Sequence, residues 1–580
     1  MKSIFTDTIN LENPFPFHPN PYFRRESFLS LDGYWDFDIT KTKEPLSNYT
    51  KRIVVPFSPE TPLSQIETHI EKDDWMHYRK KFTLSKVQLE GIGRLVFAAV
   101  DQECFVYLNG EYLGEHRSGY STFEFEVTNL REENELIVIV RDDTDSEIYP
   151  RGKQSNTPGG IWYHPTSGIW GDVYLEFVPS SGKIEKLDIS TDYKNRKISI
   201  NGVFTNKSPL IVEIFKDNLK LISTQIGIGE SVDCSSFFEA WSPDNPALFD
   251  IRISQGKDSV WSVFGFKLFE RKQVGKNHYL FLNEKPIFLS SLLDQGYWPD
   301  GGLTAPCYEA ISHDIDTIKN AGFNSLRKHI KIESMCWYYE CDKKGVIVIQ
   351  DIMNSGSKYS WWLIHLRPFI NFDVNDNDNK ILGRGSKESM EQFEKDMFVT
   401  LEQLSQPTCI CVWTLFNEGW GQFRAPEMFE KMKTASGNKL IDATSGWYDK
   451  GVGDFNSRHI YFRAPKMKSD SQRVLFLSEF GGYSMPIEHH TYSKKSFGYA
   501  SYKDNSALNK ALKKVYGVDL IKAIKEAGLS ACVYTQISDV EEEINGLMTY
   551  DRAVFKPDVE MLRSLNSDLY KVYCETIEKI

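Results

Sequence analysis

Hydrophobic and polar residues alternate along the first part of the chain in short segments separated by turn residues. Between Ser30 and about Pro179 these segments include "GYWDFDIT", "RLVFAAV", "FEFEV" and "LIVIV", and "LNGEY" places Asn-Gly at a tight hairpin turn. A period of two with frequent turns is typical of antiparallel sandwiches. We therefore predict a jelly-roll-like β-sandwich over residues 1–179.

The same alternation continues after "PSSGK" at 179–183, in segments such as "KISINGVF" and "LIVEIFKD". Roughly 90 residues with strands at this spacing predict a second, immunoglobulin-like sandwich over residues 180–273. Its segments carry no motif that suggests chemistry. We expect it to orient its neighbours.

From about Lys276 the pattern changes, and short apolar segments alternate with long amphipathic ones. The strand candidates are 287–293, 324–330, 346–352, 409–416, 439–445, 458–462, 474–480 and 531–537. The helix candidates between them include 305–322, 389–404, 426–435 and 508–528. Eight strands with intervening helices predict a (β/α)8 TIM barrel over residues 274–580.

Composition narrows the function classes. With 580 residues, 41% of them hydrophobic, the chain is expected to be globular and to hold two to four domains. The net charge of −12 is spread along the sequence, so we expect no nucleic acid and no anionic membrane surface as a partner. Nine cysteines without finger or ribbon spacing fit reduced core thiols. The N-terminus resembles no signal peptide, and we expect a cytoplasmic protein.

Two strand candidates end in the same way. Glu418 follows the buried run "CICVWTLF" and precedes Gly419 and Gly421, and Glu479 ends "VLFLSEF" before another pair of glycines. Catalytic groups of such barrels project from the C-terminal ends of the strands, so both carboxylates are expected on one rim. A helix N-cap would also explain one Asn-Glu pair. Two carboxylates that flank one cavity suit glycoside hydrolysis.

Several segments resemble, in order, those of glycoside hydrolase family 2, which contains β-galactosidases, β-glucuronidases and β-mannosidases. They are "VVPFSPETPLS", "DWMHYRKKFTL", "PTSGIWGDVYLE", "FNSLRKHIKIESMCWYYECDKKG", "FNEGWGQF", "LSEFGG" and "YTQISDVEEEINGLMTYDR". The resemblance implies a retaining double displacement in which Glu479 is the nucleophile and Glu418 is the general acid/base. This mechanism requires no cofactor and no metal.

The resemblance also implies roles for side chains near the two glutamates. Asn417 would bind the sugar 2-hydroxyl, Arg327 would keep the nucleophile ionised, and His329 would contact a sugar hydroxyl. Tyr461 would donate a hydrogen bond to the nucleophile. The alternative for Arg327 and His329 is a salt-bridged strand end. The alternative for Tyr461 is a buried tyrosine with a backbone partner.

The chain departs from the family pattern at other pocket positions. In many relatives an acidic residue of the first domain reaches into the pocket, and Trp162 occupies the nearest position in this sequence. We interpret Trp162 as a sugar-stacking group or a core tryptophan. Tyr534 and Gln536 occupy the region where relatives have a subsite tryptophan, and we expect Asp539 to contact the pocket. The Asn-x-Lys pair of β-glucuronidases is not recognisable, so glucuronides rank lower. The Glu-x-His segment that binds magnesium in relatives is also not recognisable, so we expect no required metal.

The segment 355–385 is too long for an ordinary loop after a barrel strand. Its Trp361, Trp362 and Phe369 could wall an aglycone site or form a subunit contact, so a homo-oligomer stays possible.

We predict a retaining exo-β-glycosidase that acts on a β-glycoside or small oligosaccharide, with β-galactosidase-type activity ranked first. β-Glucosidase, β-glucuronidase and β-mannosidase are the alternatives within the family. A non-catalytic carbohydrate-binding or scaffold protein is the alternative from another class.

Overall fold

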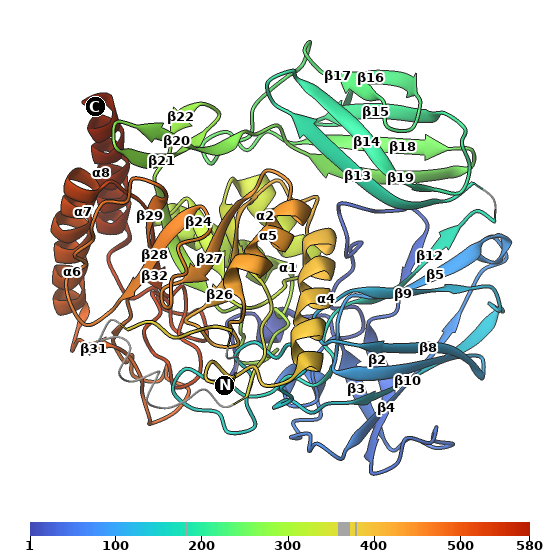
Figure 1. The fold of residues 1–580 in the computed structure, drawn as a ribbon. Coiled ribbons are helices and arrows are strands. Elements are labelled where there is room, and N and C mark those ends of the chain that lie inside the picture. The colour runs from blue at the N-terminus through green and yellow to red at the C-terminus, as the bar shows by residue number, and fades with distance from the viewer. Residues whose placement is uncertain (181, 358–371, 378–379) are drawn as a thin grey trace.

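The computed structural model describes residues 1–180, 182–357, 372–377 and 380–580. Two β-sandwiches from the first half of the chain lie beside a barrel-like sheet with its helices (Figure 1). The part of segment 355–385 that carries Trp361, Trp362 and Phe369 lies outside the described residues. Over the described ranges, no helix has the length and apolar character needed to cross a membrane.

The first sandwich is antiparallel, and Trp35, Phe97 and Val138 are buried between its two sheets. The first sheet consists of β1 (Phe28–Ser30), β12 (Val173–Val178), β5 (Ile92–Phe97) and β9 (Phe123–Val127). The second consists of β3 (Lys51–Val55), β2 (Gly33–Thr40), β4 (Trp75–Thr83), β10 (Glu133–Arg141), β7 (Glu103–Leu108) and β8 (Glu111–Arg117). A short ladder joins β6 (Val100–Asp101) to β11 (Gly168–Ile169). Short 3-10 turns span Thr6–Thr8, Pro62–Ser64 and Gln88–Glu90.

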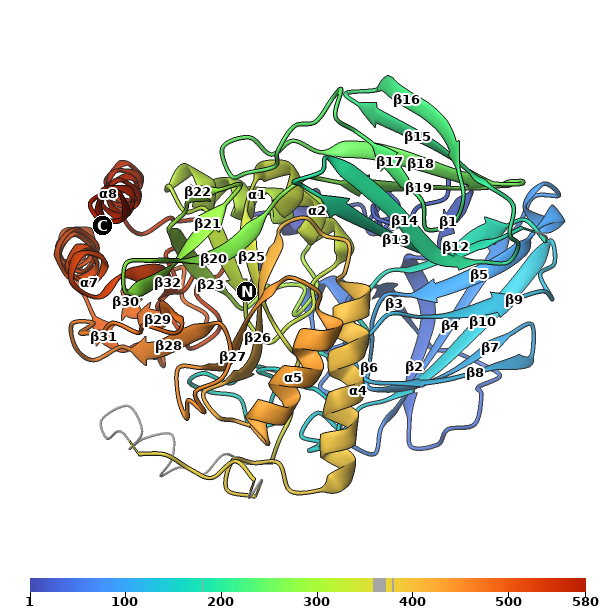
Figure 2. The same ribbon diagram turned by 45° about the horizontal axis from the view of Figure 1, so that its top comes forward.

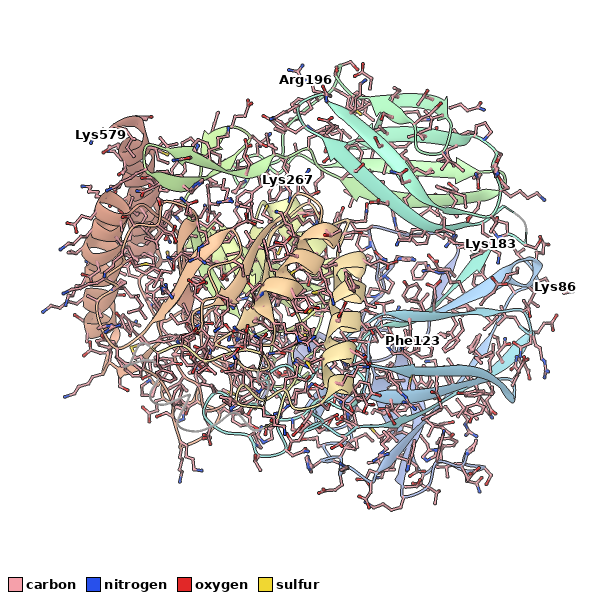
Figure 3. The ribbon with its side chains drawn as sticks, in the orientation of Figure 1. Lys86, Phe123, Lys183, Arg196, Lys267 and Lys579 are labelled. Atoms are coloured by element: carbon pink, nitrogen blue, oxygen red, sulfur yellow. The ribbon has the colours of Figure 1, made fainter. Side chains whose placement is uncertain are left out.

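The second sandwich buries Ile200, Ile214 and Phe249 between its two sheets. Its strands are β13 (Ile184–Asp192), β14 (Lys197–Phe204) and β17 (Ser231–Asp233) in one sheet, and β16 (Leu219–Ile226), β15 (Leu210–Lys216), β18 (Phe249–Gln255) and β19 (Asp258–Phe264) in the other. Lys267 lies where this sandwich joins the barrel (Figure 3), and its ammonium donates to the carbonyl oxygen of Ile410 at 2.9 Å. The sandwich is thus attached to the N-terminal end of a barrel strand.

Every strand candidate of the third region is a strand. Within the described residues the parallel strands are β23 (Leu289–Asp294), β24 (Ser325–Lys328), β25 (Ile347–Asp351), β26 (Ile410–Asn417), β27 (Leu440–Ser445), β28 (Phe455–Ile460), β29 (Val474–Gly481) and β32 (Leu529–Thr535). Most are buried along their whole length, as expected for a parallel sheet that is covered on both faces.

The barrel is not fully closed, because β27 and β28 share no backbone ladder. Side chains and one backbone hydrogen bond, from the Asp454 N–H to the Ile441 carbonyl oxygen at 2.8 Å, bridge this seam. The Ser457 hydroxyl donates to Asp442 at 2.7 Å, and the Asp454 carboxylate accepts from the Ile441 backbone N–H at 2.9 Å. The fully described connections after β27 and β28 contain no helix, so the helical layer of the expected (β/α)8 barrel is incomplete on this side.

The helices begin at side-chain caps in several places, because Ser386, Asp504 and Asp558 each accept a hydrogen bond from an N–H of the first turn. They are α1 (Tyr308–Asn320), α2 (Met335–Lys344), α4 (Lys387–Gln403), α5 (Ala425–Ala435), α6 (Asn505–Lys514), a π-helical turn (Val515–Leu520), α7 (Ile521–Ala527) and α8 (Val559–Glu578). Figure 2 shows α4 and α5 side by side, and the Gln403 side chain of α4 accepts from the Thr122 N–H of the first sandwich at 3.0 Å.

The domain boundaries at residues 179 and 273 stay predictions. One observation bears on the second of them: β20 (Phe269–Val274) pairs with β21 (Asn277–Leu282), and β21 pairs with the first residue of barrel strand β29. The sheet of the barrel therefore includes residues before 274. The remaining short strands are β22 (Lys285–Pro286), β30 (Tyr483–Ser484) and β31 (Ala500–Ser501).

Candidate active site

Glu418 and Glu479 face each other at the C-terminal ends of β26 and β29. One oxygen of each carboxylate and one ring nitrogen of His459 all lie within 4.8 Å of one another. The side chains are only 17% and 6% exposed. The structure therefore brings together two carboxylates that are 61 positions apart in the chain.

The chain turns sharply at Glu418, which itself has a positive φ of 52°. Gly421 has a φ of 66°, and a Cβ atom at this position would lie 2.5 Å from the carbonyl oxygen of Ser355. Only glycine fits there. The left-handed conformation strains the backbone at Glu418, and such strain is concentrated at functional sites.

Burial governs the protonation of Glu418. Removal from water raises the pKa of its carboxyl, while the positive charges of Lys153, then His329 and Arg327, lower it by less. The net shift is upward, so Glu418 keeps its proton to a higher pH than an exposed glutamate does. This property suits a proton donor.

Glu479 is surrounded by donors. The Arg327 guanidinium donates to its Oε1 at 3.1 Å, and the Tyr461 hydroxyl donates to its Oε2. Arg327 is fully buried. Charge-assisted hydrogen bonds of this kind stabilise the ionised form of a carboxylate. This property suits a nucleophile.

Arg327 is itself held by Asp351 at the end of β25. The two form a bidentate pair with distances of 3.0 and 3.1 Å, and Asp351 also accepts from His329 at 2.8 Å. Burial alone would raise the pKa of Asp351, but Arg327 and His329 lower it to about 2. The Asn417 oxygen accepts from Arg327 at 2.8 Å, which turns its amide NH2 away from the arginine. Sequence reasoning missed Asp351, although it ends a buried strand as the glutamates do.

Tyr461 lies flat on Tyr499, with ring centroids 3.7 Å apart. Its hydroxyl also contacts Thr535 at 3.0 Å. Burial and the Glu479 charge raise its pKa well above the ordinary value, so it stays protonated and can donate to the carboxylate. The aromatic stack fixes the direction of this donor.

His459 is a central residue that sequence reasoning missed. Its Nδ1 lies 2.8 Å from Glu418 and 3.4 Å from Glu479, and its Nε2 lies 3.3 Å from the Ser445 hydroxyl. Burial lowers its pKa to about 3, so the imidazole is neutral near pH 7. The signal was present, because His459 precedes Tyr461 by two positions and two positions along a strand bring side chains to one face.

Trp162 lies at the barrel mouth. Its ring packs edge-on against Trp420 at 5.2 Å, and the guanidinium of Arg151 lies 5.4 Å from both rings. Trp420 follows Glu418 by two residues, so a loop of the first sandwich region reaches the catalytic rim. Lys153 of this loop was also missed by sequence reasoning.

Gln536 is buried and takes part in a chain of hydrogen bonds beside the site. Its amide donates to Asn545 at 2.8 Å, and Asn545 donates to Glu543 at 2.9 Å. Glu543 accepts from the hydroxyl of Tyr163, which belongs to the first sandwich region. The acidic loop after β32 is therefore bound to the loop that carries Trp162.

Two predicted contacts lie elsewhere. The ring of Tyr534 packs against Phe480 at 5.6 Å and Tyr516 at 6.4 Å, on the helix side of the sheet, because its neighbour Thr535 takes the inward position. Asp539 forms a buried ion pair of 2.6 Å with Lys556. These contacts give neither residue a place beside the two glutamates.

The donors of Glu418, His459 and Glu479 are close enough together to hold a metal ion. Each already has a protein partner, and the Arg327 guanidinium contacts Glu479 from one side. A positive neighbour of this kind disfavours a cation. The expectation that no metal is required stays a prediction.

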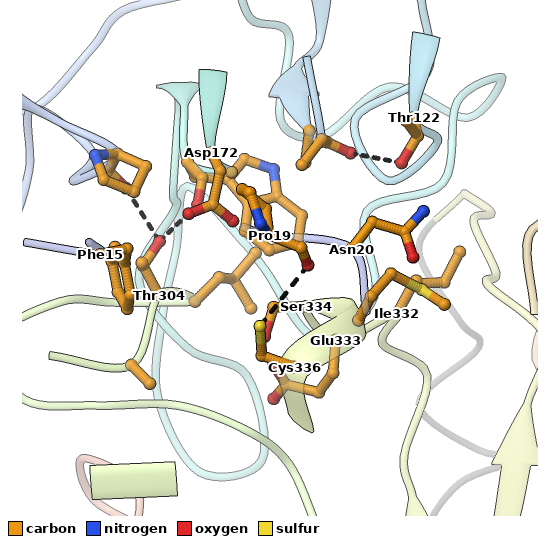
Figure 4. Close-up of a pocket in the computed structure, with 18 of the residues that line it drawn as sticks. Phe15, Pro19, Asn20, Thr122, Asp172, Thr304, Ile332, Glu333, Ser334 and Cys336 are labelled. Atoms are coloured by element: carbon orange, nitrogen blue, oxygen red, sulfur yellow. Dashed lines mark hydrogen bonds between the residues drawn. The ribbon is translucent and has the colours of Figure 1, made fainter. Parts of the chain in front are cut away.

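A separate cavity lies between the first sandwich and the barrel (Figure 4). Its lining includes Phe15, Ile332 and Cys336, but neither Glu418 nor Glu479. The Thr304 hydroxyl contacts the carbonyl oxygens of Pro56 at 3.0 Å and Trp170 at 2.6 Å. We interpret it as a packing cavity between the two parts.

Comparison with known proteins gives no matching family model. Sequence relatives are found among curated proteins. A "Beta-galactosidase" of Thermoanaerobacterium thermosulfurigenes is 24% identical over 373 residues, which are 58% of this chain and 48% of the relative. A "Beta-galactosidase large subunit" of Lactobacillus helveticus is 20% identical over 76% of this chain and 72% of the relative. A "Putative beta-glucuronidase" of Formosa agariphila is 26% identical over 51% of this chain and 30% of the relative. The matched part of the chain covers about half, or less, of the length of several of these curated relatives.

Solved structures share the fold over nearly the whole chain. A β-glucuronidase of Faecalibacterium prausnitzii has a TM-score of 0.73 at 16% identity and covers 94% of this chain and 98% of its own. A GH2 β-galacturonidase of Eisenbergiella tayi has a TM-score of 0.66 at 17% identity, with 95% and 98% covered. The chain thus shares its fold with solved glycoside hydrolases and is similar in sequence to proteins named β-galactosidase and β-glucuronidase. These likenesses support the resemblance of the chain to glycoside hydrolase family 2.

Proposed function

We propose that the protein is a retaining exo-β-glycosidase whose nucleophile is Glu479 and whose general acid/base is Glu418. The observation that supports this most directly is the approach of the two carboxylates and His459 within 4.8 Å. Retaining glycosidases have carboxyl groups about 5 to 5.5 Å apart, whereas inverting ones leave about 6.5 to 9.5 Å for a water molecule. The close spacing favours retention.

In the first step Glu479 attacks the anomeric carbon and forms an ester bond to the sugar. The bond between that carbon and the leaving oxygen breaks, and Glu418 gives its proton to this oxygen. In the second step Glu418 takes a proton from water, whose oxygen attacks the anomeric carbon and displaces Glu479. The raised pKa of Glu418 and the donors around Glu479 match these roles.

Neighbouring groups orient the reactants. The amide NH2 of Asn417 is available for the sugar 2-hydroxyl, because its oxygen is bound to Arg327. The neutral imidazole of His459 can accept a hydrogen bond from Glu418 when the carboxyl is protonated. In its other tautomer it can donate a hydrogen bond to Glu418 when the carboxylate is ionised. Glu418 alternates between these states, and His459 contacts it in both.

The rim is enclosed on one side by two loops that bind each other. His164 pairs with Glu541 at 2.8 Å, and Gly160 donates to Glu542 at 3.3 Å. A closed side favours the binding of one terminal sugar, which supports exo-action. Relatives named β-galactosidase and β-glucuronidase support galactosides and glucuronides equally, so the earlier preference for galactosides has no added support.

The proposal is tested with a panel of 4-nitrophenyl β-glycosides, followed by proton NMR of the first sugar released. Retention predicts that the β-anomer appears first and then equilibrates. Initial release of the α-anomer would show inversion. No turnover of any glycoside, together with measurable sugar binding, would favour the non-catalytic carbohydrate-binding protein.

A further inference from the structure

Lys153 belongs to the first sandwich region but is held over the barrel rim. The backbone N–H groups of Arg151 and Gly152 both donate to the carbonyl oxygen of Asn354, at 3.1 and 3.2 Å, and Asn354 lies just beyond strand β25. On the other side, the Tyr163 N–H donates to the Lys153 carbonyl at 2.9 Å. The backbone position of Lys153 relative to the rim is therefore fixed.

The ammonium group of Lys153 lies at this rim, beside the ring of Trp162. It is 5.4 Å from the ring of Trp162, which packs on Trp420 beside Glu418. Its charge also lowers the pKa of Glu418, of Glu543 and of His329, which come from three different parts of the rim. The charge of Lys153 therefore acts on barrel groups, although the residue belongs to the first sandwich region.

The cations around Lys153 are paired, whereas its own ammonium is not. Arg151 binds Asp145 at 2.7 Å, Lys331 binds Glu333 at 2.6 Å, and Arg327 binds Asp351. Among the described residues, the Lys153 ammonium has no hydrogen bond and no ion pair with a carboxylate. A cation without a carboxylate partner is available to an anionic ligand.

We propose that Lys153 binds a carboxylate on the terminal sugar, so that the protein prefers uronides to neutral glycosides. This inference rests on the proposed glycosidase function and specifies its substrate class. Arg327 is already paired with Asp351 and Glu479, so without a further cation the carboxylates of Glu479 and Glu543 would repel an acidic sugar. Lys153 supplies that cation from outside the barrel.

The test uses two matched pairs of 4-nitrophenyl substrates: the β-D-glucuronide with the β-D-glucoside, and the β-D-galacturonide with the β-D-galactoside. The members of each pair differ only in a carboxylate in place of CH2OH. We expect the acidic member of at least one pair to have the higher kcat/KM. Lys153→Met should reduce the acidic-to-neutral ratio of kcat/KM by about 10- to 100-fold, as expected for one charge-assisted hydrogen bond, mainly through KM.

Two further variants serve as controls. Lys86→Met, on the exposed surface of the first sandwich, should leave the ratio unchanged, and Lys153→Arg should recover part of it. A preference for the neutral members, or a ratio that Lys153→Met does not change, would overturn the inference while leaving the glycosidase proposal intact. Absence of all turnover would instead overturn the proposed function.

A binding measurement separates these cases. Calorimetry compares D-glucuronic and D-galacturonic acid with D-glucose and D-galactose, using the unmodified protein and Lys153→Met. Tighter binding of an acid, lost in Lys153→Met and weakened by salt, supports the inference even in the absence of turnover. Equal binding of acids and neutral sugars would overturn it.

Discussion

The Nδ1 atom of His459 lies 2.8 Å from Oε1 of Glu418, and the same atom lies 3.4 Å from Oε2 of Glu479. One neutral imidazole therefore contacts both carboxylates of the proposed double displacement. A buried neutral ring adds no charge to the site, so it can orient Glu418 without fixing its protonation state.

Replacement of His459 by Ala is expected to reduce kcat/KM for substrates with a poor leaving group by about 10- to 100-fold, because the proton donor loses its orientation. Activated aryl glycosides should be affected less, since their leaving groups need little protonation. The ratio of the two kcat/KM values measures the effect. His489→Ala, at an exposed position, is the control. Equal losses for both substrates would contradict a role in proton donation.

Glu479→Gln should reduce kcat by on the order of 10³-fold or more, because the amide cannot form the glycosyl ester. The circular dichroism spectrum should be unchanged, since glutamine has the same shape. Glu488→Gln alters an exposed glutamate and should retain full activity. Activity near that of the unmodified protein in Glu479→Gln would refute the assignment of the nucleophile.

Glu418→Ala removes the proposed acid/base. We expect kcat/KM for alkyl or phenyl glycosides to fall much more steeply than for dinitrophenyl glycosides, because only the former need a proton in the first step. A plot of log kcat/KM against leaving-group pKa measures this as a steeper slope. An unchanged slope would assign Glu418 another role.

The alkaline side of the pH profile of kcat/KM should report the loss of the Glu418 proton in the free protein. Burial raises the pKa of this group, and Lys153 is the positive charge that lowers it most. A cation stabilises the ionised carboxylate, so its removal raises the pKa further. In Lys153→Met the alkaline limb should therefore move to higher pH, measured with a neutral substrate. Movement to lower pH would show that Lys153 does not act on Glu418.

Asp351→Asn leaves the buried Arg327 with less compensating charge. Removing one partner of a buried ion pair typically costs about 3 to 5 kcal/mol, and we expect a loss of this order in the free energy of unfolding measured with urea. In the unmodified protein the folded pKa of Asp351 is about 2, below its ordinary value, so its stabilising contribution is complete above that ordinary value and is lost as the pH falls toward 2. The loss of stability in acid should be smaller in Asp351→Asn.

The barrel strands and the paired glutamates were predictable because their signals are local. Most of the strands are buried along their whole length, and Glu418 and Glu479 stand at the end of buried apolar runs beside glycines. The same reasoning could have found Asp351 and His459. Asp351 ends the buried run of β25, as the glutamates end theirs.

Other residues could not be placed from local pattern. Tyr534 was misplaced because a shift of one residue along a strand reverses the face, and Thr535 has the inward position. Asp539 pairs with Lys556, 17 positions away, across a loop whose path follows no period. Lys153 reaches the rim only because the first sandwich region packs on the barrel, a contact between segments that no periodicity encodes.

The unpaired edge between β27 and β28 lies between the two strands of the glutamates, because β27 is the neighbour of β26, which ends before Glu418, and β28 is the neighbour of β29, which carries Glu479. On that side no backbone ladder fixes the width of the gap that the anomeric carbon must occupy, and polar side chains such as Ser457 and Asp442 hold it instead. Substitutions at this seam would therefore change the distance between the two carboxylates while both glutamates stay in place.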